Sequence, residues 1–131
     1  MISLQELRVG NWVTNNTLGV YYQLKTGADI DDANNFQAIP ITDDLIKSCG
    51  FNYDTYFKFW QKNKAVSGTG PDMELDRDYW VLDFSHHRIG VELKALHQLQ
   101  NLYFLLKGRE LEINTDSFLN KSDNKAALYS V

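Results

Sequence analysis

The side chains in this sequence that are best suited to metal binding or acid–base chemistry are its three histidines, His86, His87 and His97. Adjacent side chains on a strand point to opposite faces, so His86 and His87 are a poor pair of ligands for one metal ion unless they lie in an irregular turn. A zinc site also needs three or four converging ligands. We therefore predict two turn histidines and one helix histidine in a polar network, and we expect neither a metal nor another cofactor.

A second candidate is an acidic run with alternating spacing: Asp72, Glu74, Asp76 and Asp78. This spacing is similar to that of the oxygen ligands in a calcium-binding loop, which has glycine at its sixth position and a bidentate glutamate at its twelfth. The sequence has Arg77 and Asp83 at those two positions. The pattern therefore favours a solvated acidic loop over a calcium site.

Aromatic residues are dense in the middle of the chain and could form a stacking platform for a sugar or a nucleic-acid base. If residues 56–61 form a strand, alternate side chains share one face of it. Phe57 and Phe59 would then face the core. The candidate ligand-binding residues on the opposite face are Tyr56, Lys58 and Trp60.

Cys49 is the single cysteine and the first nucleophile to consider. It lies at the C-terminal end of a predicted helix, where the helix dipole raises the pKa of a thiol, so we expect a packing role. The chain has no Gly-x-Ser-x-Gly elbow, no Walker-type phosphate loop and no His-Glu-x-x-His motif. A metal-dependent hydrolase would need a histidine to converge with an acid such as Asp83 or Glu92. The sequence favours a non-enzymatic protein.

Composition limits the partners of the chain. A net charge of -4 and a pI near 5.2 disfavour a general nucleic-acid binder, which needs lysines and arginines to displace counterions from phosphates. A single cysteine cannot form an internal disulfide, which fits a reducing compartment. No apolar run approaches the length that spans a bilayer, and the N-terminus lacks the pattern of a signal peptide. We expect an ordered cytoplasmic protein without a membrane segment.

The N-terminal part is predicted to form a β-unit. Ser3 and Glu6 have the spacing of a capping box, which indicates a short helical turn. Segments 11–13 and 20–24 flank a turn rich in asparagine and glycine, which is typical of a β-hairpin or of the entry to a small barrel.

The middle of the chain is predicted to alternate between a helix and strands. Thr42 as N-cap and Gly50 as C-terminal stop predict a helix over 43–49. Runs of aromatic and β-branched residues predict a three-stranded antiparallel meander: 56–61, 79–84 and 88–93. The stretch 62–78 has no convincing pattern and is predicted to be a loop.

The stretch 94–107 predicts a long helix with two apolar faces. At 100° per residue, one stripe that we expect to lie on the sheet contains Leu96, Leu99, Leu102, Tyr103 and Leu106. The second face combines apolar and hydrogen-bonding side chains: His97, Asn101, Phe104 and Leu105. Either the N-terminal β-unit or another chain must cover this second face.

Three segments together carry a family resemblance: Glu6 to Val13, Ile39 to Leu45 with Gly50-Phe51, and His97 to Phe104 closing on Gly108. The most specific part is His97-Gln98-Leu99-Gln100-Asn101-Leu102-Tyr103-Phe104, and the first segment carries Leu7-Arg8-Val9-Gly10-Asn11-Trp12-Val13. Their order and spacing resemble a family of short, uncharacterised bacterial proteins found in phage-like and other mobile-element contexts. The resemblance implies a fold and a genomic setting, and no established activity.

We predict an α+β fold in a single domain over 1–131, with an N-terminal β-unit (1–40), a helix, meander and long helix (41–113), and a tail (114–131). The leading hypothesis is a protein-interaction module, derived from a phage or mobile element, that binds a protein partner or a second copy of itself. Its expected contact face contains His97, Asn101, Phe104 and Leu105. The alternative is a small β-barrel that binds a ligand or single-stranded nucleic acid through Tyr56, Lys58 and Trp60.

Overall fold

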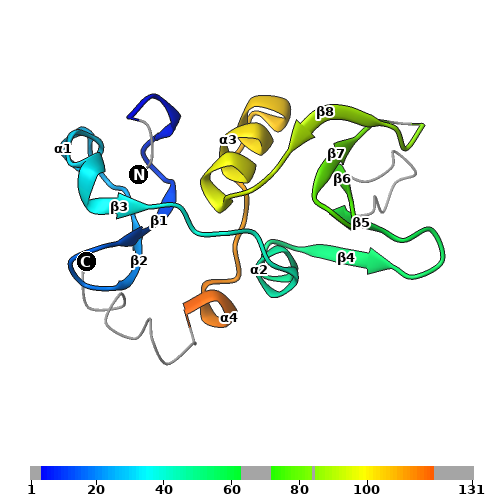
Figure 1. Cartoon of the computed structure of the whole chain (residues 1–131), viewed down its shortest axis with the longest axis horizontal. Helices are drawn as coiled ribbons and strands as arrows, with labels where there is room; N and C mark the ends of the chain where they lie inside the picture. Colours follow the sequence, from blue (N-terminus) through cyan, green and yellow to red (C-terminus); the bar gives the residue numbers. More distant parts are fainter. Residues whose placement is uncertain (1–3, 63–71, 84, 120–131) are drawn as a thin grey trace.

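The computed structural model describes residues 4–62, 72–83 and 85–119 (Figure 1). It is a mixed α+β structure with two antiparallel sheets, and α3 stands between them (Figure 1). The elements in chain order are η1 (Leu4–Glu6), β1 (Trp12–Asn15), β2 (Val20–Gln23), α1 (Gly27–Asp31), η2 (Ala33–Asn35), β3 (Phe36–Gln37), α2 (Asp43–Ser48), β4 (Phe51–Asp54), β5 (Phe59–Lys62), β6 (Met73–Asp76), β7 (Trp80–Leu82), β8 (Arg88–Glu92), α3 (Leu96–Lys107) and α4 (Thr115–Leu119).

The N-terminal sheet has the strand order β2-β1-β3. Strands β1 and β2 pair in antiparallel fashion, which confirms the predicted hairpin. The side chain of Asn15 closes the turn, because its Oδ1 accepts hydrogen bonds from the backbone N–H groups of Thr17 (2.9 Å) and Leu18 (3.1 Å). The helical turn predicted before the hairpin is η1, while its expected cap, Ser3, lies outside the described residues. In residues 4–62, 72–83 and 85–119, the strand pairings form two open sheets and no closed barrel.

The second sheet has five strands in the order β4-β5-β6-β7-β8, so the prediction of a three-stranded meander is wrong. The two predicted strands 79–84 and 88–93 are present in shorter form as β7 and β8. Strands β4 and β6 were missed because asparagine, aspartate and glutamate, which are depleted in strands, make up half of each. Strand β6 falls inside 62–78, which was predicted to be a loop, and residues 63–71 of that stretch lie outside the described part.

The predicted strand over 56–61 is wrong at its start. Residues 55–58 form a turn, in which Oδ1 of Asp54 accepts hydrogen bonds from the backbone N–H groups of Tyr56 (2.9 Å) and Phe57 (3.0 Å). Lys58 ends this turn with a φ of 61°, in the left-handed region, and β5 begins at the next residue. Local hydrogen bonds from backbone N–H groups to the Asp54 carboxylate have therefore replaced the extended conformation that the aromatic run favoured.

Helix α2 follows its predicted signals. The Oγ1 of Thr42 accepts a hydrogen bond from the backbone N–H of Leu45 at 3.2 Å, and Gly50 has a φ of 88°. The chain that leads into α2 runs beside the segment that leads into α3, because the N–H of Ile41 donates to the carbonyl of Lys94 (3.0 Å). The segment 39–45 and the start of the helix that carries His97 to Phe104, both part of the family resemblance, are therefore neighbours in the fold.

Buried apolar side chains form two clusters. The larger joins α2, α3, α4 and the five-stranded sheet, and its most deeply buried large members include Ile46, Phe51, Leu75, Leu96, Leu99 and Tyr103. The smaller lies in the N-terminal unit and contains Leu7, Val13, Leu24, Ala33 and Phe36. Helix α4 belongs to the stretch predicted as a tail, and its Phe118 ring joins the units by contacting Trp12 (5.1 Å) and Tyr21 (4.7 Å).

Helix α3 buries most of its predicted stripe, although Leu106 is 56% exposed and that part of the prediction is wrong. Leu102 is only partly buried against the larger cluster. Since α3 is followed by α4, it is not the final helix of the described chain. Within residues 4–62, 72–83 and 85–119, no helix has the length and apolar character needed to cross a bilayer.

Two leucines of α3 provide a matched test of this arrangement. Leu99 is fully buried, so Leu99→Ala is expected to lower the free energy of unfolding by about 2–5 kcal/mol. Leu105 is 79% exposed on the same helix, so Leu105→Ala is expected to change it by less than about 0.5 kcal/mol. Urea denaturation followed by circular dichroism measures both values. Equal losses would contradict the orientation of α3.

Candidate functional site

The side chain of Gln100, only 2% exposed, fixes the N-terminal segment to α3. Its Oε1 accepts a hydrogen bond from the backbone N–H of Trp12 at 2.8 Å, and its Nε2 donates to the carbonyl oxygen of Gly10 at 2.9 Å. One amide thus satisfies a donor and an acceptor of the same backbone stretch, as a neighbouring strand would. Since an unpaired buried polar group costs about 1–3 kcal/mol, these bonds select one placement of residues 10–12 on the helix. We call this contact the Gln100 joint.

Asn101 extends the joint by binding the segment just before it. Its Nδ2 donates to the carbonyl oxygen of Glu6 at 2.7 Å. Its Oδ1 accepts from Nδ2 of Asn11 at 2.8 Å and from Nε of Arg8 at 3.1 Å. Asn11 is fully buried, and its own Oδ1 accepts from the backbone N–H of Arg8 at 2.7 Å. The helix therefore recognises residues 6–12 through a connected set of polar contacts.

Arg8 links this set to the chain beyond α3. Its Nη1 and Nη2 donate to the two carboxylate oxygens of Glu110, with 3.2 Å for the Nη2 contact, and its guanidinium lies 4.5 Å from the ring centroid of Phe104. The side chains of Arg8 and Glu110 are 28% and 51% exposed. Water therefore screens the pair, which is worth about 0–1 kcal/mol. Its main effect is to orient the guanidinium over the aromatic ring.

His97 occupies the first turn of the same face and is 2% exposed. Its Nε2 lies 3.4 Å from Oε1 of Glu6, while its Nδ1 is buried and has no hydrogen bond in the described part of the chain. The histidine acts as a polar contact between the helix and the first segment.

The second face of α3 thus divides into two halves. The N-terminal unit covers His97 and Asn101, which answers the question that the sequence left open for these residues. Gln100 was not among the predicted residues, although it lies three residues after His97 on the predicted helix, and that spacing could have identified it. The remaining part is Phe104 and Leu105, which are 41% and 79% exposed, and Leu106 of the first stripe lies next to them at 56% exposed. We call these three residues the apolar end of α3.

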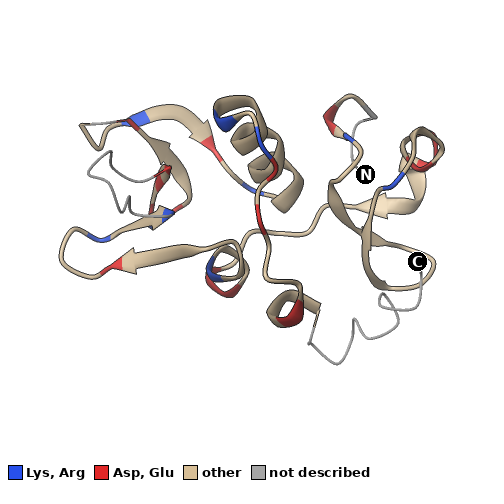
Figure 2. Cartoon of the chain, turned by 180° about the vertical axis from the view of Figure 1, so that it is seen from behind, with Lys and Arg blue, Asp and Glu red and all other residues tan. Residues whose placement is uncertain are grey.

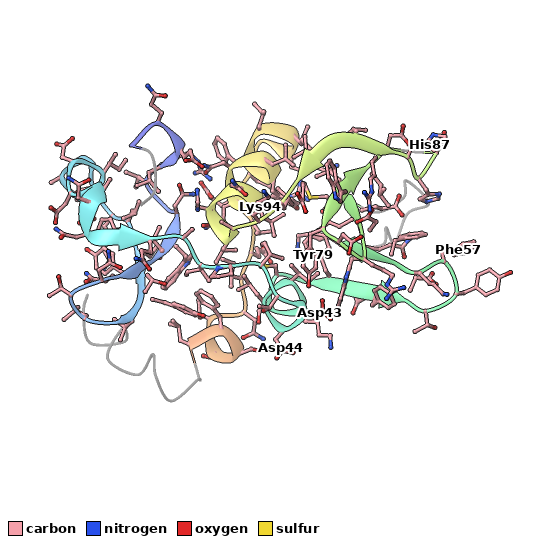
Figure 3. All side chains as sticks on the ribbon, viewed as in Figure 1. Asp43, Asp44, Phe57, Tyr79, His87 and Lys94 are labelled. Carbon is pink, nitrogen blue, oxygen red and sulfur yellow. The ribbon has the colours of Figure 1, made fainter. Side chains whose placement is uncertain are left out.

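The predicted ligand-binding set does not share one strand face, because its first two members lie in the turn before β5. Tyr56 is 82% exposed at that turn, whereas Trp60 is 3% exposed and its ring packs against Tyr53 at 5.0 Å. Figure 3 places Phe57, which was expected in the core, at the far end of the five-stranded sheet, and it is 64% exposed. The geometry assumed for Tyr56, Lys58 and Trp60 is therefore wrong.

Lys58 and Trp60 instead line a pocket of about 540 Å³. The pocket lies where the end of α2 meets β4, β5 and the turn after β6. Its lining combines three cations, one carboxylate and two aromatic rings: Lys47, Lys58, Arg77, Asp43, Tyr53 and Trp60. We call this site the basic pocket.

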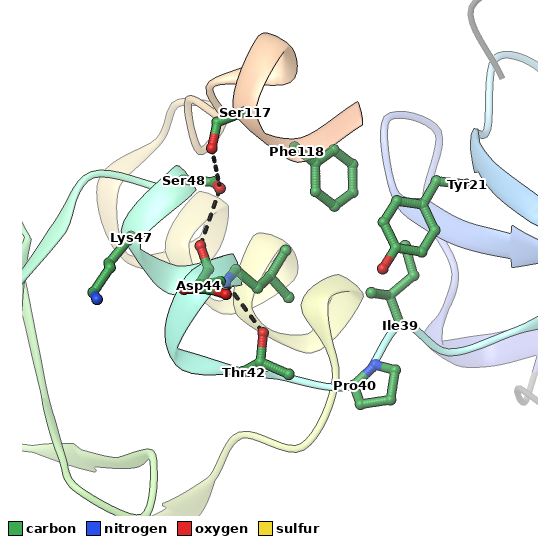
Figure 4. A pocket seen from close by; sticks show the side chains of 10 residues that line it. Tyr21, Ile39, Pro40, Thr42, Asp44, Lys47, Ser48, Ser117 and Phe118 are labelled. Carbon is green, nitrogen blue, oxygen red and sulfur yellow. Dashed lines mark hydrogen bonds between the residues drawn. The ribbon is translucent and has the colours of Figure 1, made fainter. Parts of the chain in front are cut away.

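A second pocket of about 310 Å³ lies between β2, α2 and α4 (Figure 4). Its walls include the apolar side chains of Ile39, Pro40 and Phe118. Two hydroxyl groups, Ser48 and Ser117, lie 3.4 Å apart at its edge, and the first donates to a backbone carbonyl of α2. Among the described residues, neither hydroxyl is hydrogen-bonded to a histidine or lysine side chain, although Lys47 also lines the pocket.

His86 and the acids of the run considered for calcium have side-chain partners on or beside the five-stranded sheet. His86 lies 3.2 Å from Glu74 and stacks on Phe59 with a centroid distance of 4.6 Å. Three acids of the run considered for calcium pair with arginines: Asp72 with Arg109, and Asp76 and Asp78 with Arg88. Over residues 4–62, 72–83 and 85–119, no three His, Cys, Asp or Glu side chains converge as a metal site.

Cys49 and Lys62 form a buried contact at the edge of the larger cluster. Lys62 is 3% exposed, and its Nζ donates to the carbonyl oxygen of Cys49 at 2.7 Å. Burial lowers the pKa of the Lys62 ammonium and raises the pKa of the Cys49 thiol to about 12. The predicted rise in the pKa of Cys49 is confirmed, but its main cause is burial and not the helix dipole. A neutral thiol of this kind packs and does not act as a nucleophile.

Comparison with known proteins finds no matching family model, no matching curated protein and no matching solved structure. The family resemblance seen in the sequence stays a prediction. The candidate sites therefore depend on the geometry of the chain itself: the Gln100 joint, the apolar end of α3 and the basic pocket.

The Gln100 joint can be tested with a nearly isosteric change. Gln100→Glu keeps an acceptor for the N–H of Trp12 but places a charged oxygen against the carbonyl oxygen of Gly10. We therefore expect the free energy of unfolding to fall by about 3–5 kcal/mol at neutral pH. The loss should shrink in acid, where the protonated carboxyl can donate again. Gln5→Glu, at an exposed position, is the control. Urea denaturation at several pH values measures both, and a loss independent of pH would contradict the contact.

Burial of Cys49 predicts a loss of stability in alkali. Between pH 9.0, the ordinary thiol value, and about 12 the unfolded chain releases this proton and the folded chain keeps it. The free energy of unfolding should therefore fall with rising pH, by up to about 1.4 kcal/mol per pH unit from this group. Cys49→Ala should remove that part of the slope. Denaturation of the parent chain and of Cys49→Ala at a series of pH values measures the two slopes. Identical slopes would refute the raised pKa of Cys49.

Proposed function

We propose that this chain is a non-enzymatic protein-interaction module and that the apolar end of α3 is its contact surface. The observation that supports the proposal most is the exposure of two adjacent leucines, Leu105 at 79% and Leu106 at 56%, beside the half-exposed ring of Phe104. Isolated apolar side chains are common on protein surfaces, whereas a contiguous group on one element is typical of an interface. Among the described residues, no histidine is hydrogen-bonded to a serine, threonine or cysteine side chain.

The apolar end of α3 is held rigidly, which favours binding. The helix is fixed from one side by the Gln100 joint and from the other by Tyr103, whose ring is buried and whose hydroxyl donates to Asp72 at 2.9 Å. Gly108 ends the helix with a φ of 69° and donates its N–H to the carbonyl of Phe104 at 2.9 Å. A surface that is already ordered loses little conformational entropy when a partner binds.

The partner we propose is a second copy of the chain. Both signs of charge follow the apolar end within a few residues: Lys107, Arg109, Glu110 and Glu112. Within the chain, Lys107 and Arg109 pair with Asp72, and Glu110 pairs with Arg8, so these charges are largely balanced where they stand. A two-fold contact places the same surface against itself, and a surface with balanced charge does not repel its own copy. A surface with one sign would repel its copy.

A double substitution tests this surface. Leu105→Ser combined with Leu106→Ser is expected to keep the fold, because both side chains are exposed, and to raise the dissociation constant of the dimer at least about tenfold. Leu18→Ser changes a comparably exposed leucine (53%) in the N-terminal hairpin and should leave that constant unchanged. Sedimentation equilibrium and circular dichroism give both readouts.

Three results would reject the proposed contact. A parent chain that is monomeric at every accessible concentration would exclude the second copy. If the double variant and Leu18→Ser changed the dissociation constant equally, the location of the leucines on α3 would not matter for dimerisation. Unfolding of the double variant would show that these leucines belong to the core.

A further inference from the structure

The basic pocket gathers positive charge on a chain whose net charge is -4. Lys47, Lys58 and Arg77 all line it, and Asp43 is the one carboxylate among its lining side chains. Asp43 already accepts a hydrogen bond from the hydroxyl of Tyr79, and Figure 3 shows these two residues side by side. The pocket therefore keeps an excess of positive charge over the negative charge in its own walls.

These three cations differ from most others in the described part of the chain. Ion pairs to carboxylates hold Arg8, Arg88, Lys94, Lys107 and Arg109. Within residues 4–62, 72–83 and 85–119, no carboxylate lies within ion-pair distance of Lys47, Lys58 or Arg77. Like charges that share a pocket repel each other, and a bound anion relieves that repulsion.

The backbone positions of the cations are fixed by separate local structures. Lys47 stands in the last turn of α2. Lys58 is held by the turn of Asp54, to whose carbonyl its N–H donates at 2.7 Å. Arg77 lies in the turn after β6, where Oδ1 of Asp76 accepts from two backbone N–H groups at 2.9 Å and 3.1 Å. Three ordered elements therefore present their cations to one volume.

The size and lining of the pocket indicate a small anion. A volume of about 540 Å³ is within the usual range for small-molecule sites, about 300–1,000 Å³. A planar guanidinium pairs with two oxygens of a phosphate, and two ammonium groups add point charges. Figure 2 shows basic and acidic segments interspersed over the described chain, which does not suit a long polyanion such as nucleic acid.

We infer that the basic pocket binds the phosphate group of a small molecule, with Arg77 as the bidentate contact and Lys47 and Lys58 as the flanking cations. Tyr53, partly exposed beside the buried ring of Trp60, forms an apolar wall for the rest of the ligand. The phosphate can come from the free ion or from a phosphate monoester. This site is separate from the proposed contact surface on α3.

Isothermal titration calorimetry tests this site with inorganic phosphate, glycerol phosphate and uridine monophosphate, and with glycerol and uridine as controls without phosphate. We expect saturable binding of at least one phosphorylated probe and none of the controls. A monoester that binds more tightly than inorganic phosphate identifies the source as a small metabolite, and the reverse order identifies the free ion.

Variants assign the binding to the pocket. Arg77→Ala and Lys58→Ala should each weaken binding about tenfold or more, because each removes a charged hydrogen bond. Lys47→Ala provides a third variant if one of these fails to fold by circular dichroism. Lys25→Ala, an exposed lysine of the N-terminal unit, should leave the affinity unchanged. No saturable binding, equal binding of uridine, or equal weakening by Lys25→Ala would each overturn the assignment.

Discussion

Two hydrogen bonds from one buried side chain, Gln100, hold the backbone of residues 10–12 against α3. Trp12 makes one of these bonds through its own N–H, and its ring lies in the larger cluster, where its centroid is 5.1 Å from that of Phe118 in α4. The N-terminal sheet, α3 and α4 therefore depend on one placement of a short segment. Because both groups of the amide are satisfied by backbone, a shift by one residue would leave buried groups unpaired.

The extent of this polar contact also decides which part of α3 stays exposed. Residues 6–12 reach His97, Gln100 and Asn101 and end there, with Arg8 alone extending to Phe104. In the next turn, Leu105 and Leu106 are 79% and 56% exposed. The described contacts of residues 6–12 thus separate the covered part of α3 from its exposed apolar end.

Three aspartates bind the backbone of the turns between strands, and two of them, Asp76 and Asp83, were considered in the sequence for metal-dependent chemistry. Asp54, Asp76 and Asp83 each accept hydrogen bonds from two nearby N–H groups and fix the turns between strands. Two of these turns carry Lys58 and Arg77 into the basic pocket. Short-range hydrogen bonds thus place charges that are distant in sequence into one volume.

The sequence determined the α+β class, the hairpin of the N-terminal unit, the limits of α2 and the buried positions Leu96, Leu99 and Tyr103 of α3. Each follows from caps, turns and periodicity, which act within a few residues. Tertiary structure alone decided that β4 and β6 each pair with β5 and that Leu106 is exposed while Asn101 is covered. It also decided that the three cations of the basic pocket converge. A four-residue strand needs a partner to exist, and a side-chain amide recognises a segment ninety residues away only after folding.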